Sequence, residues 1–344
     1  MKGKQGLVCM GLLLVLSSCH TGKQITASGL QRKDFQTEVN GQHTDLFTLS
    51  NKQGMEVCIT NYGARVVSIL VPDRNGKRED VVCGFSTITE YMEQRQNFGS
   101  TVGRYIGRIL NARFTLDGVE YKLVPNNGKS GHISHGGNPG FADRIWKVEQ
   151  ADTHRVCLSY LSPDGENGFP GNLKVTLVYS LGEDDNALDL TYEATTDAPT
   201  VLNLSHHSFF NISGNFTKSV EDQQLWVDAD RFTPYDDKKC VTGEYLPVAG
   251  TPLDFRMPHT IGECIDADHP QLKVVNGYDH TWELNTKGDD TRPAAWVYDP
   301  ASGRKMEIFT TEPGMQIYTG NGLKGKMTGK GGIAYPFRSA VCFE

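Results

Sequence analysis

The chain has 344 residues, of which 38% are hydrophobic and 22% are charged. With 34 Lys and Arg residues against 41 Asp and Glu residues, its formal net charge is −7 at pH 7. An acidic chain lacks the basic face that phosphate backbones require, and this excludes nucleic acid as the expected partner. A chain of this length is enough for one large all-β domain or for two ordinary domains.

The first eighteen residues have the order of an export signal. Lys2 and Lys4 supply a short positive region, an apolar run extends from Gly6 to Leu16, and small residues precede Cys19. The apolar run is too short to cross a bilayer, which takes roughly 18 to 20 residues. We therefore predict a signal peptide over residues 1–18 and no transmembrane span there.

The sequence Leu16-Ser17-Ser18-Cys19 resembles the lipobox of bacterial lipoproteins. The resemblance implies cleavage before Cys19 and lipidation of that residue, with the protein exported and lipid-anchored at a periplasmic or outer-membrane face. An ordinary secretory signal with an incidental cysteine is the alternative. Residues 19–37 are polar and short of large apolar residues, so we predict a tether there. The membrane would then be contacted only through the lipid anchor.

The cysteines of the remaining chain are scattered. No two of them have Cys-x-x-Cys spacing, so the pattern indicates neither a structural zinc site nor a redox motif. Single cysteines in a core of this size are more often buried free thiols than a disulfide framework. We expect no obligatory disulfide among the six residues Cys58, Cys83, Cys157, Cys240, Cys264 and Cys342.

Strand-like alternation dominates the chain after the predicted tether. Apolar residues at every second position predict strands over residues 173–181 and 188–194, because such segments bury one face and expose the other. No helical segment recurs between strands, which disfavours a parallel α/β sheet. We predict an all-β fold, a single large antiparallel β-sandwich over residues 38–344.

Two local signals give expected turns. Asp117-Gly118 separates two short alternating runs and predicts a hairpin turn. Thr87 and Glu90 have the spacing of a capping box, which predicts a short helical turn after Thr87.

Four polar clusters lie beside strand-like sequence. In the first cluster, two arginines among glycines can donate planar forks to an oxygen-rich ligand. In the fourth, carboxylates, aromatic rings and amides together suit a sugar, whose ring has hydroxyl edges and apolar faces. Each cluster alone would also fit an inert polar surface. The clusters span residues 101–109, 134–146, 202–211, and 276–282 together with 310–321.

His206 and His207 are adjacent in the third cluster. Side chains alternate along a strand, so these two imidazoles point to opposite faces and cannot jointly hold one metal ion. We therefore expect no zinc site from this pair. One histidine should face a site, and the other should face packing or solvent.

Taken in chain order, the clusters resemble the aldose 1-epimerase (galactose mutarotase) family. The similarity runs from about Phe47 to the last residue and implies the large β-sandwich of that family. The motifs that carry it are Gly-Arg-Tyr-x-Gly-Arg-Ile from residue 103, His-Gly-Gly from residue 135, Asn-Leu-Ser-x-His-Ser-Phe-Phe-Asn from residue 203, Gly-Tyr-Asp-His from residue 277, and Thr-Thr-Glu-Pro-Gly-Met-Gln-Ile-Tyr-Thr-Gly-Asn from residue 310.

The resemblance implies an acid/base reaction that opens a hexose ring and closes it on the other face of C1. By similarity, Glu344 matches the catalytic base and His207 matches the acid that protonates the ring oxygen. Arg108, His135 and Asp279 match residues that bind and orient the sugar. Two proton transfers of this kind require no metal and no other cofactor. The implied partner is a hexose such as glucose or galactose, and the oligomeric state stays open.

This sequence departs from the family pattern at three positions. Gly107 and His206 stand where the family commonly has asparagine, and the change at His206 is expected to shift the pKa of the neighbouring acid. Family members also continue beyond the position of Glu344 with further strands. Because terminal residues usually fray, we expect Glu344 to be weakly held.

Two other functions remain as alternatives. The departures favour a membrane-tethered carbohydrate-binding protein with impaired catalysis, whereas the retained His207 and Glu344 oppose it. An epimerase of phosphorylated sugars is disfavoured, because phosphosugars are held inside cells and the motifs contain no dense basic cluster.

Overall fold

The computed structural model describes residues 24–344, and every pairing between its named strands is antiparallel. Four larger sheets and several two-stranded pairs make up the fold. The all-β prediction is confirmed, with two short α-helices as additions: α1 (Ile88–Gln94) and α2 (Pro270–Val275). No helix in residues 24–344 is long and apolar enough to cross a membrane.

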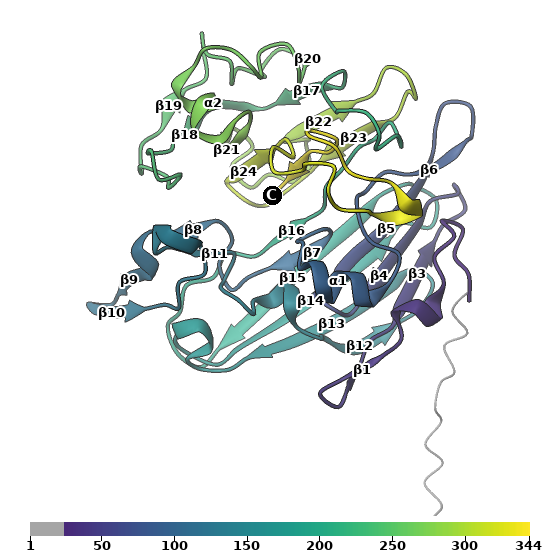
Figure 1. The fold of residues 1–344 in the computed structure, drawn as a ribbon, viewed down its shortest axis with the longest axis horizontal. Coiled ribbons are helices and arrows are strands. Elements are labelled where there is room, and N and C mark those ends of the chain that lie inside the picture. Colours follow the sequence, from purple (N-terminus) through teal and green to yellow (C-terminus); the bar gives the residue numbers. More distant parts are fainter. Residues whose placement is uncertain (1–23) are drawn as a thin grey trace, which may run out of the picture.

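The first half of the chain forms two four-stranded sheets that enclose one hydrophobic core (Figure 1). Alternate side chains such as Val57, Ile59, Val175 and Leu177 point into that core and are fully buried. The first sheet contains β3 (Leu46–Ser50), β4 (Glu56–Thr60), β5 (Arg65–Pro72) and β6 (Arg78–Asp80). The second contains β12 (Lys147–Ala151), β13 (Arg155–Ser162), β14 (Leu173–Leu181) and β15 (Leu188–Thr196).

The second half repeats this arrangement with two further sheets around a second core, drawn in green and yellow in Figure 1. The four-stranded sheet contains β20 (His259–Thr260), β17 (Gln224–Val227), β22 (Ala295–Tyr298) and β23 (Lys305–Ile308). The five-stranded sheet contains β19 (Leu246–Pro247), β18 (Ala229–Thr233), β21 (Asp279–Leu284), β24 (Gly314–Tyr318) and β25 (Cys342–Phe343). The last strand of the chain therefore lies at an edge of this sheet, next to β24.

Short elements complete the fold and carry several of the predicted site residues. The two-stranded pairs are β1 (Glu38–Val39) with β2 (Gln42–His43), β7 (Ser100–Val102) with β16 (Ser205–His207), β8 (Arg108–Ile109) with β11 (Ile133–Ser134), and β9 (Arg113–Leu116) with β10 (Val119–Lys122). The 3-10 turns are η1 (Arg32–Phe35), η2 (Leu110–Ala112), η3 (Gly128–Ser130), η4 (Phe141–Asp143), η5 (Glu166–Gly168) and η6 (Lys330–Gly332).

The local predictions agree with the structure. In β14 the apolar positions are buried and the alternate positions are more exposed, as expected for a strand with one face on the core. Asp117 and Gly118 both have positive φ, of 51° and 80°, and join β9 to β10 in a tight hairpin. Thr87 Oγ accepts a hydrogen bond from Glu90 N, and the Glu90 carboxylate accepts one from Thr87 N, which completes the capping box of α1.

Residues 24–37 differ from the predicted tether and pack on the domain. Leu30 and Phe35 are buried in the cluster that contains α1, and the Arg32 guanidinium donates to the Asp45 carboxylate at 2.8 Å. Although the segment contains few large apolar residues, burial of these two side chains in the core is enough to hold it against the domain. The predicted signal peptide over residues 1–18, the predicted lipidation site Cys19 and residues 20–23 lie outside the described residues.

The six cysteines are free thiols in the structure, in agreement with the expectation of no disulfide. Four of them are buried, which is typical of cysteines that pack as small apolar side chains: Cys58, Cys83, Cys240 and Cys342.

The loop after β11 holds His135 in an uncommon backbone conformation. His135, Gly136 and Gly137 have φ values of 52°, 78° and 104°. A Cβ atom at Gly136 would lie 1.9 Å from the carbonyl oxygen of Gly103. Only glycine permits this close approach, and the contact fixes where the His135 side chain leaves the loop.

Gly136→Ala should therefore destabilise the protein by about 2 to 5 kcal/mol, because backbone strain adds to a steric clash. Gly107→Ala is the matched control, since Gly107 also has positive φ (77°) but a Cβ atom there would meet no neighbouring atom of residues 24–344 within 4 Å. The control should cost only about 1 to 2 kcal/mol of backbone strain. Urea unfolding measures both values, and equal losses would contradict the steric argument.

His280 lies in the second core with its imidazole completely buried. Its Nδ1 accepts a hydrogen bond from the backbone N–H of Asp279 at 3.3 Å, and the ring packs edge-on against Phe232. Burial, with a smaller contribution from His269, lowers the pKa of His280 from 6.5 to about 3. The unfolded chain therefore binds a proton that the folded chain rejects, so stability present above pH 6.5 falls as the pH drops toward 3.

Replacing the titrating ring tests this linkage. Between about pH 7 and pH 5, His280 should cost the wild-type protein about 2 kcal/mol of unfolding free energy. His280→Phe keeps an aromatic ring in the core but cannot be protonated. The unfolding free energy that this variant loses between about pH 7 and pH 5 should therefore be smaller than the wild-type loss by about 2 kcal/mol. An unchanged loss in His280→Phe would refute the assignment.

Candidate active site

The strand β16 brings His207 to the boundary between the two halves of the fold. It pairs with β7, with His207 opposite Ser100, and the Gly99 N–H donates to the His207 carbonyl oxygen at 3.0 Å. Three residues further on, Phe210 pairs with Val341 through two backbone hydrogen bonds of 2.7 and 2.8 Å. This bridge joins the segment of His207 to the last segment of the chain.

Glu344 follows β25 and is held on both backbone groups. Its N–H donates to the Gln316 carbonyl oxygen at 2.8 Å, and its carbonyl oxygen accepts from the Gln316 N–H at 2.7 Å. The carboxylate side chain is 3% exposed. The expected fraying of Glu344 is therefore not seen, because the pairing with β24 extends through this residue.

These placements bring the predicted acid and base into contact. His207 Nε2 lies 3.2 Å from Glu344 Oε1, and the His207 side chain is 7% exposed. The ring of Phe209 stacks on the His207 imidazole, with centroids 5.0 Å apart and an interplanar angle of 18°. The stacked ring and the strand pairing together fix the direction in which Nε2 points.

Burial is the largest cause of the pKa shifts of Glu344 and His207. It raises the pKa of Glu344 well above 4.5; Asp279 raises it further and Arg108 opposes the shift. Burial also lowers the pKa of His207 well below 6.5, with His135 as the next cause. At a separation of 3.2 Å the two groups could form an ion pair, but burial favours the neutral forms. Burial therefore favours the protonated carboxyl of Glu344 and the neutral imidazole of His207.

Arg108 and His135 lie next to each other because β8 and β11 pair, with Ser134 opposite Arg108. The ring of His135 meets the ring of His207 at a centroid distance of 5.5 Å. Burial, aided by Arg108, lowers the pKa of His135 to about 4, so its imidazole is neutral. A neutral imidazole can both donate and accept hydrogen bonds, as sugar hydroxyls require.

Asp279 lies at the start of β21, opposite Tyr318 of β24. The Gln316 side-chain amide donates to Asp279 Oδ1 at 2.7 Å. Burial raises the pKa of Asp279 to about 6, while Arg108 and the Gln316 hydrogen bond act against that rise. The structure thus brings all five predicted residues, His207, Glu344, Arg108, His135 and Asp279, to one pocket.

Gln316 lies in one of the sequence motifs, but its role was not predicted from sequence. Its backbone holds Glu344 and its side chain holds Asp279, so one residue positions two predicted site groups. The alternation of this strand could have indicated that Gln316 faces the pocket. The neighbouring residues Met315 and Ile317 are buried on one face, and Gln316 therefore lies on the opposite face. Phe209 and Tyr318 also line the pocket without having been predicted.

The prediction that His206 and His207 face opposite sides is confirmed. His206 packs against the Tyr179 ring at a centroid distance of 6.0 Å, on the side away from Glu344. Burial lowers its pKa to about 4. As expected from the departure at this position, His206 also contributes to lowering the pKa of His207, although less than burial and His135 do.

The backbone conformation of Gly107 explains why glycine can stand where the family commonly has asparagine. Its φ of 77° lies in the left-handed region, which glycine and asparagine adopt more readily than other residues. The Gly107 carbonyl oxygen accepts a hydrogen bond from His135 N at 2.9 Å. Glycine therefore preserves the backbone of the loop and removes only the side chain.

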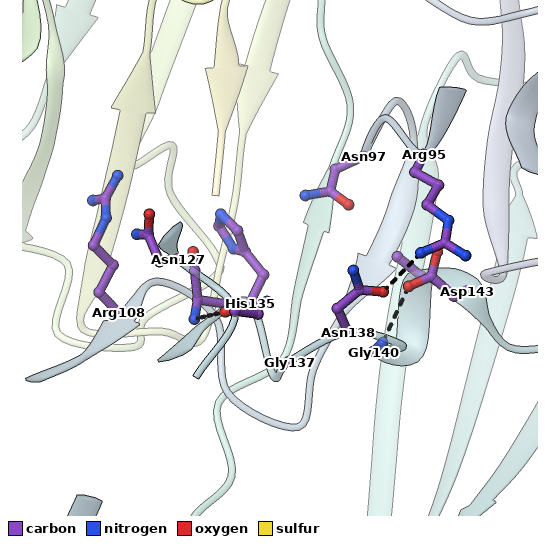
Figure 2. A pocket seen from close by; sticks show the side chains of 12 residues that line it. Arg95, Asn97, Arg108, Asn127, His135, Gly137, Asn138, Gly140 and Asp143 are labelled. Carbon is purple, nitrogen blue, oxygen red and sulfur yellow. Dashed lines mark hydrogen bonds between the residues drawn. The ribbon is translucent and has the colours of Figure 1, made fainter. Parts of the chain in front are cut away.

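The pocket between the halves has a volume of about 420 Å³. A second pocket of about 360 Å³ adjoins it, and Asn97, Arg108 and His135 line both. Figure 2 shows the second pocket, in which the Arg95 guanidinium donates to Asn138 Oδ1 at 3.2 Å. Amide and charged side chains surround this extension, so the groove continues beyond the His207–Glu344 pair as a polar surface. Its further lining includes Asn126, Asn127 and Asp143.

Known proteins show the same sequence pattern. Residues 45–342 match the profile of the family described as aldose 1-epimerase. Galactose mutarotase from Sus scrofa is 39% identical over 298 residues, covering 87% of this chain and 84% of that protein. Aldose 1-epimerase from Escherichia coli (strain K12) is 36% identical over 286 residues, covering 83% of this chain and 81% of that protein.

Solved structures agree with the sequence comparison. An aldose epimerase homologue from C. elegans superposes with a TM-score of 0.79 at 30% identity, covering 87% of this chain and 88% of that one. Galactose 1-epimerase from Lactobacillus acidophilus NCFM gives 0.78 at 29% identity, covering 89% of this chain and 87% of that one. With sequence and fold in agreement over most of its length, the chain belongs to the aldose 1-epimerase family.

Proposed function

We propose that the protein interconverts the α and β anomers of hexoses such as glucose and galactose, with Glu344 as base and His207 as acid. The observation that carries this proposal is the buried contact of 3.2 Å between the two side chains at one pocket. Family membership supports the activity, and the pocket supports these residue roles. No metal or nucleotide is needed for the two proton transfers of ring opening.

The buried contact between His207 and Glu344 fits this reaction. In the reactive arrangement Glu344 is a carboxylate and His207 is an imidazolium. Glu344 then takes the proton of the C1 hydroxyl while His207 delivers its proton to the ring oxygen, and the C1–O5 bond breaks. The pair is left neutral, which burial favours. Rotation about the C1–C2 bond followed by the reverse transfers closes the ring on the other face and restores the starting arrangement.

Three neighbours supply orientation in this proposal. Arg108 offers a planar donor fork, neutral His135 offers a donor or an acceptor, and Asp279 offers an acceptor held by Gln316. The positive charge of Arg108 also lowers the pKa of Glu344 against the effect of burial, so it favours the carboxylate that the first step requires. A sugar held by these groups would present its C1–O5 edge to the acid and base.

The first measurement is the polarimetric decay of freshly dissolved α-D-glucose and α-D-galactose. The wild-type protein should accelerate the decay, and His207→Asn or Glu344→Gln should each lower kcat by about 10²-fold or more. His206→Asn changes the adjacent residue on the opposite face and is the matched control. It should leave kcat within the same order of magnitude, with folding checked by circular dichroism.

The outcomes separate enzyme from binding protein. Unchanged turnover in His207→Asn would remove the acid assignment. A folded wild-type protein that binds sugar in a titration yet gives no acceleration would instead support the binding-protein alternative.

We also propose that the protein is exported and lipid-anchored through Cys19. The support is the order of basic, apolar and small residues before that cysteine. Several acyl chains give stable anchoring, whereas a single chain gives marginal binding. An exported mutarotase would act on sugars outside the cytoplasm.

This location is testable in a bacterial host. The full chain should partition with membranes and carry an acylated N-terminal cysteine by mass spectrometry, whereas Cys19→Ala should not be acylated. Cys9→Ala, within the predicted signal peptide, is the control and should still be acylated. Release of unmodified soluble protein from the wild-type chain would favour the ordinary secretory signal.

A further inference from the structure

Cys342 lies on the same side of the last strand as Glu344. The two residues are two positions apart, and strand alternation points both side chains in one direction, toward His207. The ligand atoms of His207, Cys342 and Glu344 all lie within 4.8 Å of one another. Cys342 is completely buried, and the proposed reaction does not use its thiol.

We propose that His207, Cys342 and Glu344 form an inhibitory site for Zn²⁺ or a similar thiophilic divalent cation. Imidazole, thiolate and carboxylate are the side chains that bind zinc in proteins. Around a tetrahedral zinc ion, with bonds of about 2.0 to 2.3 Å, ligand atoms lie roughly 3.3 to 3.8 Å apart. His207 Nε2 and Glu344 Oε1 are already 3.2 Å apart, so small side-chain movements complete the site.

This donor set differs from the pair that the sequence excluded. His206 points away from the site, so the two adjacent histidines do not bind one ion together. Cys342 replaces the second histidine as a donor, and the fourth position of the ion is left to water. The ion enters from the pocket, because His207 and Glu344 line it.

Charge balance supports the cation. A Cys342 thiolate and a Glu344 carboxylate together neutralise Zn²⁺ inside a buried site. The Cys342 thiol must lose its proton to bind the ion, so affinity should weaken as the pH falls. Asp279 adds a further negative charge beside Glu344, whereas Arg108 opposes the cation.

Zinc in this site removes the acid and the base together. It should therefore compete with the sugar, raising KM without lowering kcat. This inhibition rests on the proposed function, whereas zinc binding itself does not. The test accordingly measures binding and activity separately.

Binding is measured on the full chain without sugar. Zn²⁺ affinity is obtained by competition with a chromophoric chelator, and Cd²⁺ is added to detect the ultraviolet charge-transfer band of a cadmium–thiolate bond. The wild-type protein should bind one equivalent and show the band. Cys342→Ser should lose the band and raise the Zn²⁺ dissociation constant by at least about tenfold, since even the loss of an outer-shell partner costs 10- to 100-fold.

Two further variants make the result specific. Cys264→Ser changes a half-buried thiol away from the pocket and should keep both the band and the affinity. Glu344→Gln should weaken Zn²⁺ binding with the thiol intact, which tests the site even if Cys342→Ser folds poorly. In polarimetry, Cys342→Ser should turn over sugar like the wild type but resist zinc.

Separate results overturn the two proposals. No cadmium–thiolate band in the wild-type protein, or Zn²⁺ affinity unaffected by both Cys342→Ser and Glu344→Gln, would refute the metal site whatever the enzyme activity. Zn²⁺ binding to a protein that shows no mutarotation would leave the metal site standing and refute the proposed function. Zinc that lowers kcat at saturating sugar would refute the competitive mode of inhibition.

Discussion

The contact between His207 and Glu344 is the constraint on which the rest of the site depends. The two residues are far apart in sequence and meet because Phe210 pairs with Val341 and Gln316 pairs with Glu344. Both side chains are nearly removed from solvent. In such surroundings the neutral form of each group is favoured. A buried acid and base that share one proton can exchange it through a bound hemiacetal without taking a proton from water.

Strand β24 organises the groups around that contact. Gln316 binds the backbone of Glu344 and the carboxylate of Asp279, and buried neighbours on either side hold it in place. Because side chains alternate along a strand, Cys342 and Glu344, two positions apart at the end of the chain, point to the same side. The same strand geometry therefore places the Glu344 carboxylate at the pocket and within 4.8 Å of the Cys342 thiol, as the proposed metal site requires.

On the other side of the pocket, the backbone conformation of the loop after β11 determines where the His135 side chain lies. His135 and its two following glycines all have positive φ, and Gly136 packs directly on the backbone of Gly103. Gly107, directly before β8, accepts a hydrogen bond from His135 N and adopts a left-handed conformation that asparagine also tolerates. The substitution at this position is thus compatible with the site, because the backbone and not the missing side chain holds His135.

The sequence by itself determined the all-β class, the β14 and β15 strands, the hairpin at Asp117-Gly118 and the capping box at Thr87, because local periodicity and turn chemistry carry these features. Through ordered motifs it also indicated the five site residues. Only the tertiary structure decided that residues 24–37 pack on the domain, that Glu344 is held, and that Gln316 and Cys342 belong beside it. Those outcomes depend on pairings between distant strands and on burial, neither of which is expressed in local sequence.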